Sequence, residues 1–531
     1  SKGLCRPDTL QGPLSGWRIP RSDAMEWPGE DGAGDLSAAA PCDFLVLGGG
    51  ASGCVVARRL ADAGYAVTLV EAGVDPLAAE GCGGGGGAGE LRGACLDPLR
   101  AAELWGSGGW MGAKGTGGES QGADADRLDY AFMTEPEPSA GGRRVPLSAG
   151  RALGGGTAIN NGLYGVAWAQ PQLHPWKEWA SRPLDLAAWR PELLAPCVER
   201  AAATLAPRLP PETPRLQAFD EAMVALGDSE GGVGAATRVA WLVDDAGKRV
   251  TVASAYLGAT AEGAASRPRL HVLVRARAVS LDFDEARSGS GGLACRGALV
   301  ELRGEAPGAK PRRTVLRAGR EVVVCCGPIL TPVLLMRSGI GPAEELAEAN
   351  VPVRVASPHV GRNLTTQPTL PLRPATTGRI PAVGPALQPV APAKAPLGRG
   401  LELAVFAWPQ LGILYALGLN TPAARGDVRL PVGDDDAEAL PRIRLGLLGH
   451  PLDMERMTWG LQRARAVAAH PALREHFAGL EPAWPPGEET PAGSAGDASA
   501  GAGRGSADCQ RWLAERISST RHPMGTCRMA L

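Results

Sequence analysis

The chain has few aromatic residues, no long apolar segment and no excess of either charge. Aromatic residues make up 5% of its 531 residues, and no aromatic pattern typical of a particular ligand can be recognised. No apolar run reaches the roughly 18 residues of a membrane-spanning helix. The net charge of −2 excludes the electrostatic footprint of a nucleic-acid-binding protein or of an acidic-membrane binder. A hydrophobic content of 44% supports a full core, and this length suits two large domains or a few small ones.

The number and spacing of the cysteines also give no sign of a disulfide framework or a zinc site. Eleven cysteines form an odd set without a C-x-x-C pair, which favours reduced thiols and a reducing compartment such as cytoplasm or plastid. Cys325 and Cys326 follow a β-like run, and we predict that they are buried packing residues. The chain starts at Ser1, and about forty residues precede the first expected strand. They could be the remains of a transit peptide or a disordered lead, so localisation stays open.

One segment near the start predicts a site for a dinucleotide. The apolar run 44–47 enters a G-x-G-x-x-G turn at Gly48, Gly50 and Gly53, a helical pattern follows, and a second apolar strand ends in Glu71. Two other G-x-G-x-x-G matches begin in the glycine run 81–89, but neither follows a strand or opens a helix. Only the first match has the full context that such a motif requires.

Each part of this segment has a physical reason. Gly48 allows the tight turn, Gly50 lets the backbone approach a pyrophosphate, and Gly53 allows close packing of helix and strand. The free N–H groups at the helix start, around Ala51 and Ser52, face phosphates. Glu71, followed by Ala72, can accept hydrogen bonds from an adenosine ribose.

Two longer motifs point to a family. The first runs from Gly150 to Asn160, followed by Tyr164 and Ala167, and the second covers 327–341. Together with the amino-terminal unit they resemble the two signatures of the glucose–methanol–choline (GMC) oxidoreductases, with one departure at Leu173. Further stretches resemble family segments in the right order: 129–136, 254–257, 270–279, 360–364 and 522–529.

The resemblance implies non-covalent FAD as cofactor. In the first motif, small residues after Arg151 let backbone N–H groups approach a flat ligand, and Asn160 can hydrogen-bond at a ring edge. A tight structural turn would explain the same residues. Some relatives attach the flavin to a His at the position that Ile159 occupies here. The cofactor-binding residues we expect are Gly48, Gly50, Ala51, Ser52, Gly53, Glu71, Ala72, Arg151, Leu153, Gly155, Gly156, Thr157, Asn160, Gly162 and Val279.

His522 is the catalytic residue that the resemblance implies. The stretch His-Pro-Met-Gly-Thr-Cys-Arg-Met begins there, and the matching family His takes the hydroxyl proton of an alcohol while hydride goes to flavin N5. An imidazole suits this task because its ordinary pKa lies near working pH. A packing role at a strand start is the alternative.

Two departures from the family stand out. Relatives continue for about fifty residues after this His motif, on the scale of a βαβ unit, and carry a second catalytic His or Asn there, so we expect a C-terminally truncated sequence. Thr366-Gln367-Pro368 replaces the Asp-His-Pro of many relatives, which puts a local hydrogen-bond arrangement in doubt.

The expected fold is α/β (α+β overall): a Rossmann-like FAD-binding domain with a second domain of antiparallel sheet and helices. The FAD-binding domain should comprise 41–175, 230–345 and 515–531, and the substrate domain 176–229 and 346–484. Residues 1–40 form an extension, and 485–510 a flexible insertion by composition. The Pro- and Ala-rich stretch 371–400 suggests an irregular excursion, whereas 454–469 has helical periodicity.

The leading hypothesis is therefore an FAD-dependent oxidoreductase that takes a small-molecule alcohol as substrate, with no nucleic-acid partner. Fatty-acid photodecarboxylases and hydroxynitrile lyases of the same fold are alternatives. A non-catalytic structural or assembly protein that keeps the flavin fold is a third, and it would suit a missing second base.

Overall fold

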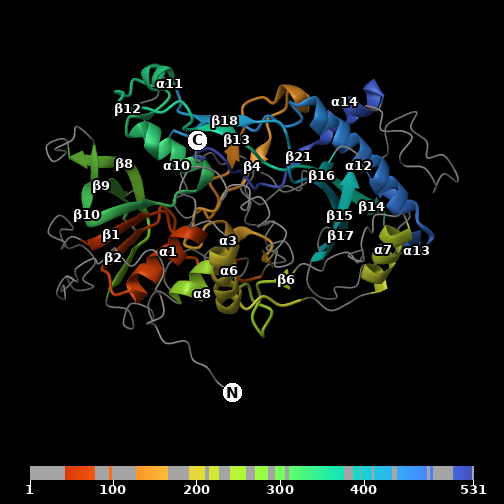
Figure 1. The fold of residues 1–531 in the computed structure, drawn as a ribbon, viewed down its shortest axis with the longest axis horizontal. Coiled ribbons are helices and arrows are strands. Elements are labelled where there is room, and N and C mark those ends of the chain that lie inside the picture. The colour runs from red at the N-terminus through yellow and green to blue at the C-terminus, as the bar shows by residue number, and fades with distance from the viewer. Residues whose placement is uncertain are drawn as a thin grey trace.

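The computed structural model describes residues 42–77, 95–97, 127–164, 191–209, 214–225, 240–258, 269–284, 293–304, 310–375, 387–395, 398–408, 412–432, 439–474, 479–481 and 506–528. Two β-sheets with helices against them dominate this part, one at the left and one at the right of Figure 1. The expected extension 1–40, the glycine run 81–89 and residues 485–505 of the expected insertion lie outside the described residues. The fold class predicted from the sequence is confirmed.

The first sheet contains the predicted strand–glycine–helix–strand unit. Its strand order is β7-β2-β1-β10-β9-β8, with β7, β2, β1 and β10 parallel and β10, β9 and β8 antiparallel. The first unit is confirmed: strand β1 precedes the glycine turn, helix α1 follows it, and β2 comes next. The elements are β1 (Cys42–Leu47), α1 (Ala51–Asp62), β2 (Val67–Val70), β7 (Leu270–Leu273), β8 (Ala276–Asp284), β9 (Ala294–Leu302) and β10 (Arg312–Val324).

Strand β1 is apolar on both faces because both faces are covered. Phe44 and Val46 pack in one core cluster with Cys54 and Ala57 of α1. Residues 45 and 47 pack in another cluster with Leu334 of helix α10 (Gly327–Arg337). Buried parallel strands show this continuous apolar pattern instead of alternation.

The second sheet is antiparallel and carries the longest described helix. Its order is β15-β16-β17-β14-β20, and β21 pairs with β14 beside β20. Helix α12 (Pro451–Ala469) includes the predicted helical stretch and buries Met457 and Leu461 in the same cluster as Leu370 and Leu417 of the sheet. The strands are β14 (Pro368–Ala375), β15 (Leu387–Ala395), β16 (Gly398–Trp408), β17 (Gly412–Leu419), β20 (Gly479–Glu481) and β21 (Ser518–Ser519).

The prediction of an irregular excursion at 371–400 is wrong for those of its residues that the structure describes. Residues 371–375 belong to β14, 387–395 form β15, and 398–400 begin β16. Strand β15 lies at the edge of its sheet, where proline is tolerated because one side of the strand needs no ladder hydrogen bonds. The insertion expected at 485–510 also ends too late, because 507–510 form the first turn of α14 (Ala507–Arg516), capped by Ser506.

The chain segment after α14 contacts both the second sheet and helix α10, which packs against the first sheet. Strand β21 pairs with β14 of the second sheet. A few residues later, Thr365 and Met524 form an isolated bridge, and Thr526 Oγ1 donates to the carbonyl of Pro328 in α10 at 2.5 Å. Residues 518–526 therefore contact the second sheet and the first turn of α10.

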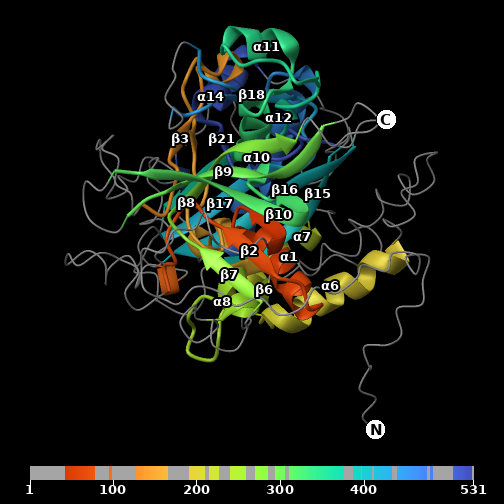
Figure 2. The same cartoon turned by 90° about the vertical axis from the view of Figure 1, so that its left-hand side faces the viewer.

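Smaller elements complete the described part of the chain (Figure 2). In this part, no helix is long and apolar enough to cross a bilayer, and no three His, Cys, Asp or Glu side chains cluster as a metal site. The nine described cysteines are all free. The remaining elements are β3 (Phe132–Met133), η4 (Pro138–Ala140), β4 (Pro146–Leu147), α3 (Gly156–Ile159), β5 (Leu163–Tyr164), α6 (Pro191–Leu205), α7 (Pro214–Ala225), β6 (Ala240–Trp241), α8 (Val252–Leu257), β11 (Ile340–Gly341), α11 (Ala343–Glu348), β12 (Val355–Ala356), β13 (Arg362–Leu364), β18 (Gly426–Arg429), β19 (Arg442–Arg444) and α13 (Pro471–Arg474).

Candidate active site

A cavity of about 1000 Å³ lies between the two sheets. On one side it is lined at the carboxyl ends of β1, β2 and β10, and on the other by Thr369 of β14 and Gly418 of β17. Ligands of open α/β sheets bind at the carboxyl ends of the strands. The volume of the cavity lies at the upper end of the range of about 300–1,000 Å³ for small-molecule and cofactor pockets.

Two glycine loops form one wall of this cavity, and an added side chain would clash at one contact between the loops and at one contact within the first loop. A Cβ on Gly155 would lie 2.8 Å from Gly50 Cα, and one on Gly53 would lie 1.9 Å from the carbonyl oxygen of Gly48. The backbone N–H of Gly154 donates to Gly49 O at 2.8 Å. The loop of the first signature is thus fastened directly onto the dinucleotide-type turn.

The start of α1 leaves backbone donors at the cavity. Its N-cap residue is Gly50, with no side chain to cap the helix, and Ala51 and Ser52 line the cavity. Unsatisfied N–H groups and the helix dipole make such an end an anion site. The residues therefore fit a pyrophosphate here.

Glu71 is a buried carboxylate at the end of β2. Its Oε2 accepts from Gly49 N at 2.7 Å and its Oε1 from Gly73 N at 2.8 Å. Burial raises the pKa of Glu71 to about 7, against the lowering effect of these two hydrogen bonds. Each carboxylate oxygen keeps a further lone pair, and Glu71 lines the cavity, so it can accept a hydroxyl group of a ligand.

Eleven of the fifteen expected cofactor-binding residues line the cavity, and four do not. The four are Gly53, Arg151, Leu153 and Gly162; Leu153 is buried behind Gly49, and the Arg151 guanidinium lies 5.8 Å from the centre of the Tyr130 ring. The eleven are Gly48, Gly50, Ala51, Ser52, Glu71, Ala72, Gly155, Gly156, Thr157, Asn160 and Val279.

Asn161 is a cavity residue that the sequence reasoning missed. It lines the same wall as Asn160, and its buried Oδ1 has no hydrogen-bond partner within the described residues. Buried polar atoms are nearly always satisfied, so this atom suits a ligand that donates to it. The signature pattern specifies only its neighbour Asn160, which is why the motif gave no signal.

His522 lines the cavity and is an exposed residue. The surrounding protein disfavours the charged imidazolium and, with a smaller effect from the positive charge of Arg521, lowers the pKa of His522 below its ordinary value of 6.5. The imidazole is therefore neutral at physiological pH and able to accept a proton.

Gln367 fixes the orientation of that imidazole. Its Oε1 lies 2.9 Å from Nδ1 of His522 and also accepts from Thr520 Oγ1 at 2.9 Å. In this assignment Nδ1 carries the hydrogen, which leaves Nε2 as the basic nitrogen. Gln367 is one of the residues that depart from the family pattern; the other, Thr366, pairs with Ser519 at 2.7 Å.

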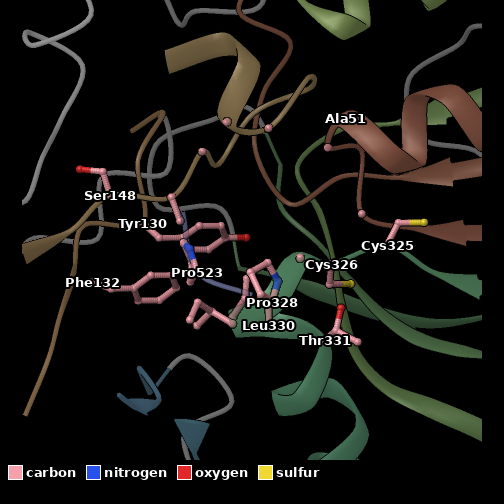
Figure 3. Close-up of a pocket in the computed structure, with 18 of the residues that line it drawn as sticks. Ala51, Tyr130, Phe132, Ser148, Cys325, Cys326, Pro328, Leu330, Thr331 and Pro523 are labelled. Carbon is pink, nitrogen blue, oxygen red and sulfur yellow. The ribbon is translucent and has the colours of Figure 1, made fainter. Parts of the chain in front are cut away.

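Aromatic and apolar side chains form another part of the wall (Figure 3). The rings of Tyr130 and Phe132 are stacked with centroids 5.2 Å apart, and Pro328 and Leu330 at the start of α10 line the same cavity. This arrangement gives an apolar lining beside the polar glycine loops.

Cys325 and Cys326 pack against the two core clusters of the first sheet, as predicted, but neither is fully buried. Both are partly exposed and line the cavity. The reason is their place after the last residue of β10, where the chain leaves the sheet at its ligand-binding edge beside Gly48. Burial in the protein raises the pKa of the Cys326 thiol to about 12, so it stays protonated.

Comparison with known proteins identifies the family. Two sequence profiles described as GMC oxidoreductase match residues 42–369 and 422–530. The chain belongs to the GMC oxidoreductase family. GMC oxidoreductases are FAD flavoproteins. The chain is 26% identical to the oxygen-dependent choline dehydrogenase of Sinorhizobium medicae over 558 aligned positions, covering 92% of this chain and 85% of that one. The choline dehydrogenase of Rhizobium meliloti is 25% identical with the same coverage.

Solved structures of this GMC fold resemble the chain along most of its length. Pyridoxine 4-oxidase from Mesorbium loti aligns with a TM-score of 0.68 and 23% identity, over 92% of this chain and 89% of that one. A formate oxidase aligns with a TM-score of 0.62 and 19% identity, with the same coverage. At these identities the likeness shows the fold alone.

Proposed function

We propose that this GMC oxidoreductase oxidises an alcohol with bound FAD, using His522 as the base. The observation that carries the proposal is that one cavity combines the glycine wall, Glu71 and a neutral His522 held by Gln367. The choline dehydrogenases and the pyridoxine oxidase to which the chain is similar are named for substrates that carry a hydroxyl group.

The chain's own groups fit FAD along the glycine wall. Backbone donors at Ala51 and Ser52 would take the pyrophosphate, and Glu71 would accept the ribose hydroxyls. Asn160 and Asn161 would hydrogen-bond to a ring edge. When bound, FAD would supply the two-electron acceptor for the hydride of the substrate carbon.

His522 accepts the proton that the substrate releases. Its Nε2 accepts the substrate hydroxyl proton, while Nδ1–H stays bonded to Gln367 Oε1 and holds the ring in place. Because the surrounding protein lowers the pKa of His522, the unprotonated form of the base is favoured before substrate arrives. A positioned base of this kind contributes about 10²–10⁴-fold in rate.

The flavin is held without a covalent bond at the signature loop. Ile159, at the position where some relatives carry the attaching His, has a side chain without a nucleophilic atom, and it is 4% exposed. The affinity for FAD must therefore come from the hydrogen bonds and contacts of the glycine wall.

Cofactor release tests the proposal. Denaturing the purified protein should free FAD, identified by chromatography against FAD, FMN and NAD standards, and the holoprotein should turn over alcohols with an artificial electron acceptor. A protein that releases only a nicotinamide nucleotide, or nothing, would overturn the proposal. Carbon dioxide release from a fatty acid under blue light would replace it with photodecarboxylation.

A further inference from the structure

Arg249 is a buried cation behind the cavity wall to which the proposed reaction assigns no task. The residue is 3% exposed and follows the turn 244–248, where Val243 and Arg249 form an antiparallel bridge. Burial lowers the pKa of Arg249 to about 10, so the guanidinium stays charged at neutral pH. Buried charges are costly unless they are hydrogen-bonded. The hydrogen-bond partners of the Arg249 guanidinium therefore indicate what this residue does.

Backbone contacts fix the position of the guanidinium. The backbone N–H of Arg249 donates to Leu96 O at 2.6 Å, and its Nε donates to Cys95 O at 2.7 Å. Cys95 in turn donates its thiol to Ala158 O of helix α3 at 3.2 Å. Arg249 thus joins segment 95–97 to the first-signature loop.

Among the described residues, the remaining hydrogen bonds of Arg249 are made by Nη1 to Asn160, and its Nη2 has no partner there. Its Nη1 donates to the backbone carbonyl of Asn160 and, at 2.9 Å, to Oδ1 of the same residue. Oδ1 also accepts from Gly162 N at 2.8 Å. Both partners of this oxygen are obligatory donors, so the amide cannot be flipped. Asn160 lines the cavity, and among the described residues its Nδ2 hydrogens have no partner, so they can be donated to a ligand.

We propose that Arg249 is a positioning residue that locks Asn160 as a hydrogen-bond donor to FAD. The inference rests on the proposed function, because FAD is the ligand that would accept from Asn160. On this proposal, Arg249 acts by fixing the orientation of the Asn160 side chain, and not by supporting the fold in general.

A double-mutant cycle on FAD affinity tests this. Apoprotein of the wild type, Arg249→Met, Asn160→Ala and the double variant is titrated with FAD, and quenching of flavin fluorescence gives the dissociation constants. Each single variant should bind about 2- to 13-fold more weakly, as expected for one lost hydrogen bond. The double variant should bind no more weakly than Asn160→Ala, because Arg249 acts through Asn160.

A second variant of Asn160 distinguishes the loss of its hydrogen-bond donor from the loss of side-chain packing. Asn160→Asp keeps an oxygen for Arg249 but has no amide hydrogens, so FAD affinity should fall as far as in Asn160→Ala. Arg208→Met is the matched control: Arg208 pairs with the exposed Asp245 at 2.7 Å and joins the same hairpin through Trp241, yet it does not touch the cavity. Its FAD affinity should match that of the wild type.

Three outcomes would overturn the inference. Additive losses in the cycle would mean that Arg249 acts independently of Asn160, and wild-type affinity in Asn160→Asp would mean that no donor is needed. If Arg249→Met is too unstable to titrate, Arg249→Lys replaces it in the cycle. Additive losses of FAD affinity in Arg249→Lys and Asn160→Ala would again mean that Arg249 acts independently of Asn160. A wild type that binds no FAD would instead overturn the proposed function, and this inference with it.

Discussion

The side-chain oxygen of Gln367 lies 2.9 Å from Nδ1 of His522, across 155 residues of sequence. This contact decides which nitrogen of the imidazole can act as a base. The pair Thr366-Gln367 departs from the family pattern in the sequence, and in the structure both side chains are hydrogen-bonded.

Gln367→Glu should move the pH dependence of turnover. A carboxylate beside Nδ1 favours the imidazolium and raises the pKa of His522, so the base stays protonated to higher pH. The acid limb of kcat/KM, expected below pH 6.5 in the wild type from the lowered pKa, should shift upward. Thr366→Ser is the control, because it keeps the hydroxyl that pairs with Ser519. An unshifted limb in Gln367→Glu would show that Gln367 does not act on His522.

FAD affinity should depend on pH through Glu71. In the apoprotein burial raises the pKa of this carboxyl to about 7, and the ionised form makes the stronger hydrogen bonds to hydroxyl groups. Affinity should therefore increase as pH rises through about 7 and level off above it. Glu71→Gln should abolish this dependence and weaken binding by about 1.5–3 kcal/mol. Titrations at several pH values check this, and a pH-independent wild type would refute it.

Local patterns were predictable from the sequence because neighbouring residues determine them. The strand, glycine turn and helix from 42 to 62 follow from apolar runs and three glycines, and the family motif marked His522. Contacts between distant segments left no such signal: Gln367 with His522, Arg249 with Asn160, and the pairing of Pro-rich β15 with β16. Cys325 and Cys326 pack as predicted, but their partial exposure was missed because an apolar run does not reveal that its end opens onto a cavity.

Gly53→Ala should lower both stability and FAD affinity. The new methyl group would lie 1.9 Å from the Gly48 carbonyl oxygen, so helix α1 must move away from the glycine turn. We expect a loss of about 1–3 kcal/mol in the free energy of unfolding, as for other overpacked sites, measured by urea unfolding of the apoprotein. Gly319→Ala in β10 is the control, since its methyl group would meet Cys42 O at an ordinary 3.5 Å. Equal stability of the two variants would contradict the packing described here.

The linkage of the flavin has a simple readout. With Ile159 at the signature loop, acid precipitation should leave all flavin in the supernatant and a colourless protein pellet. A pellet that remains yellow after washing would mean that another residue holds the flavin covalently.

The most direct test of the central claim is the rate of flavin reduction by an alcohol substrate in the wild type and in His522→Ala. The holoproteins are mixed anaerobically with the same alcohol, and the visible flavin absorbance is followed in a stopped-flow instrument. We predict that His522→Ala retains FAD but is reduced about 10²–10⁴-fold more slowly, the usual contribution of a positioned base. Equal reduction rates in the two proteins, with FAD bound in both, would contradict it.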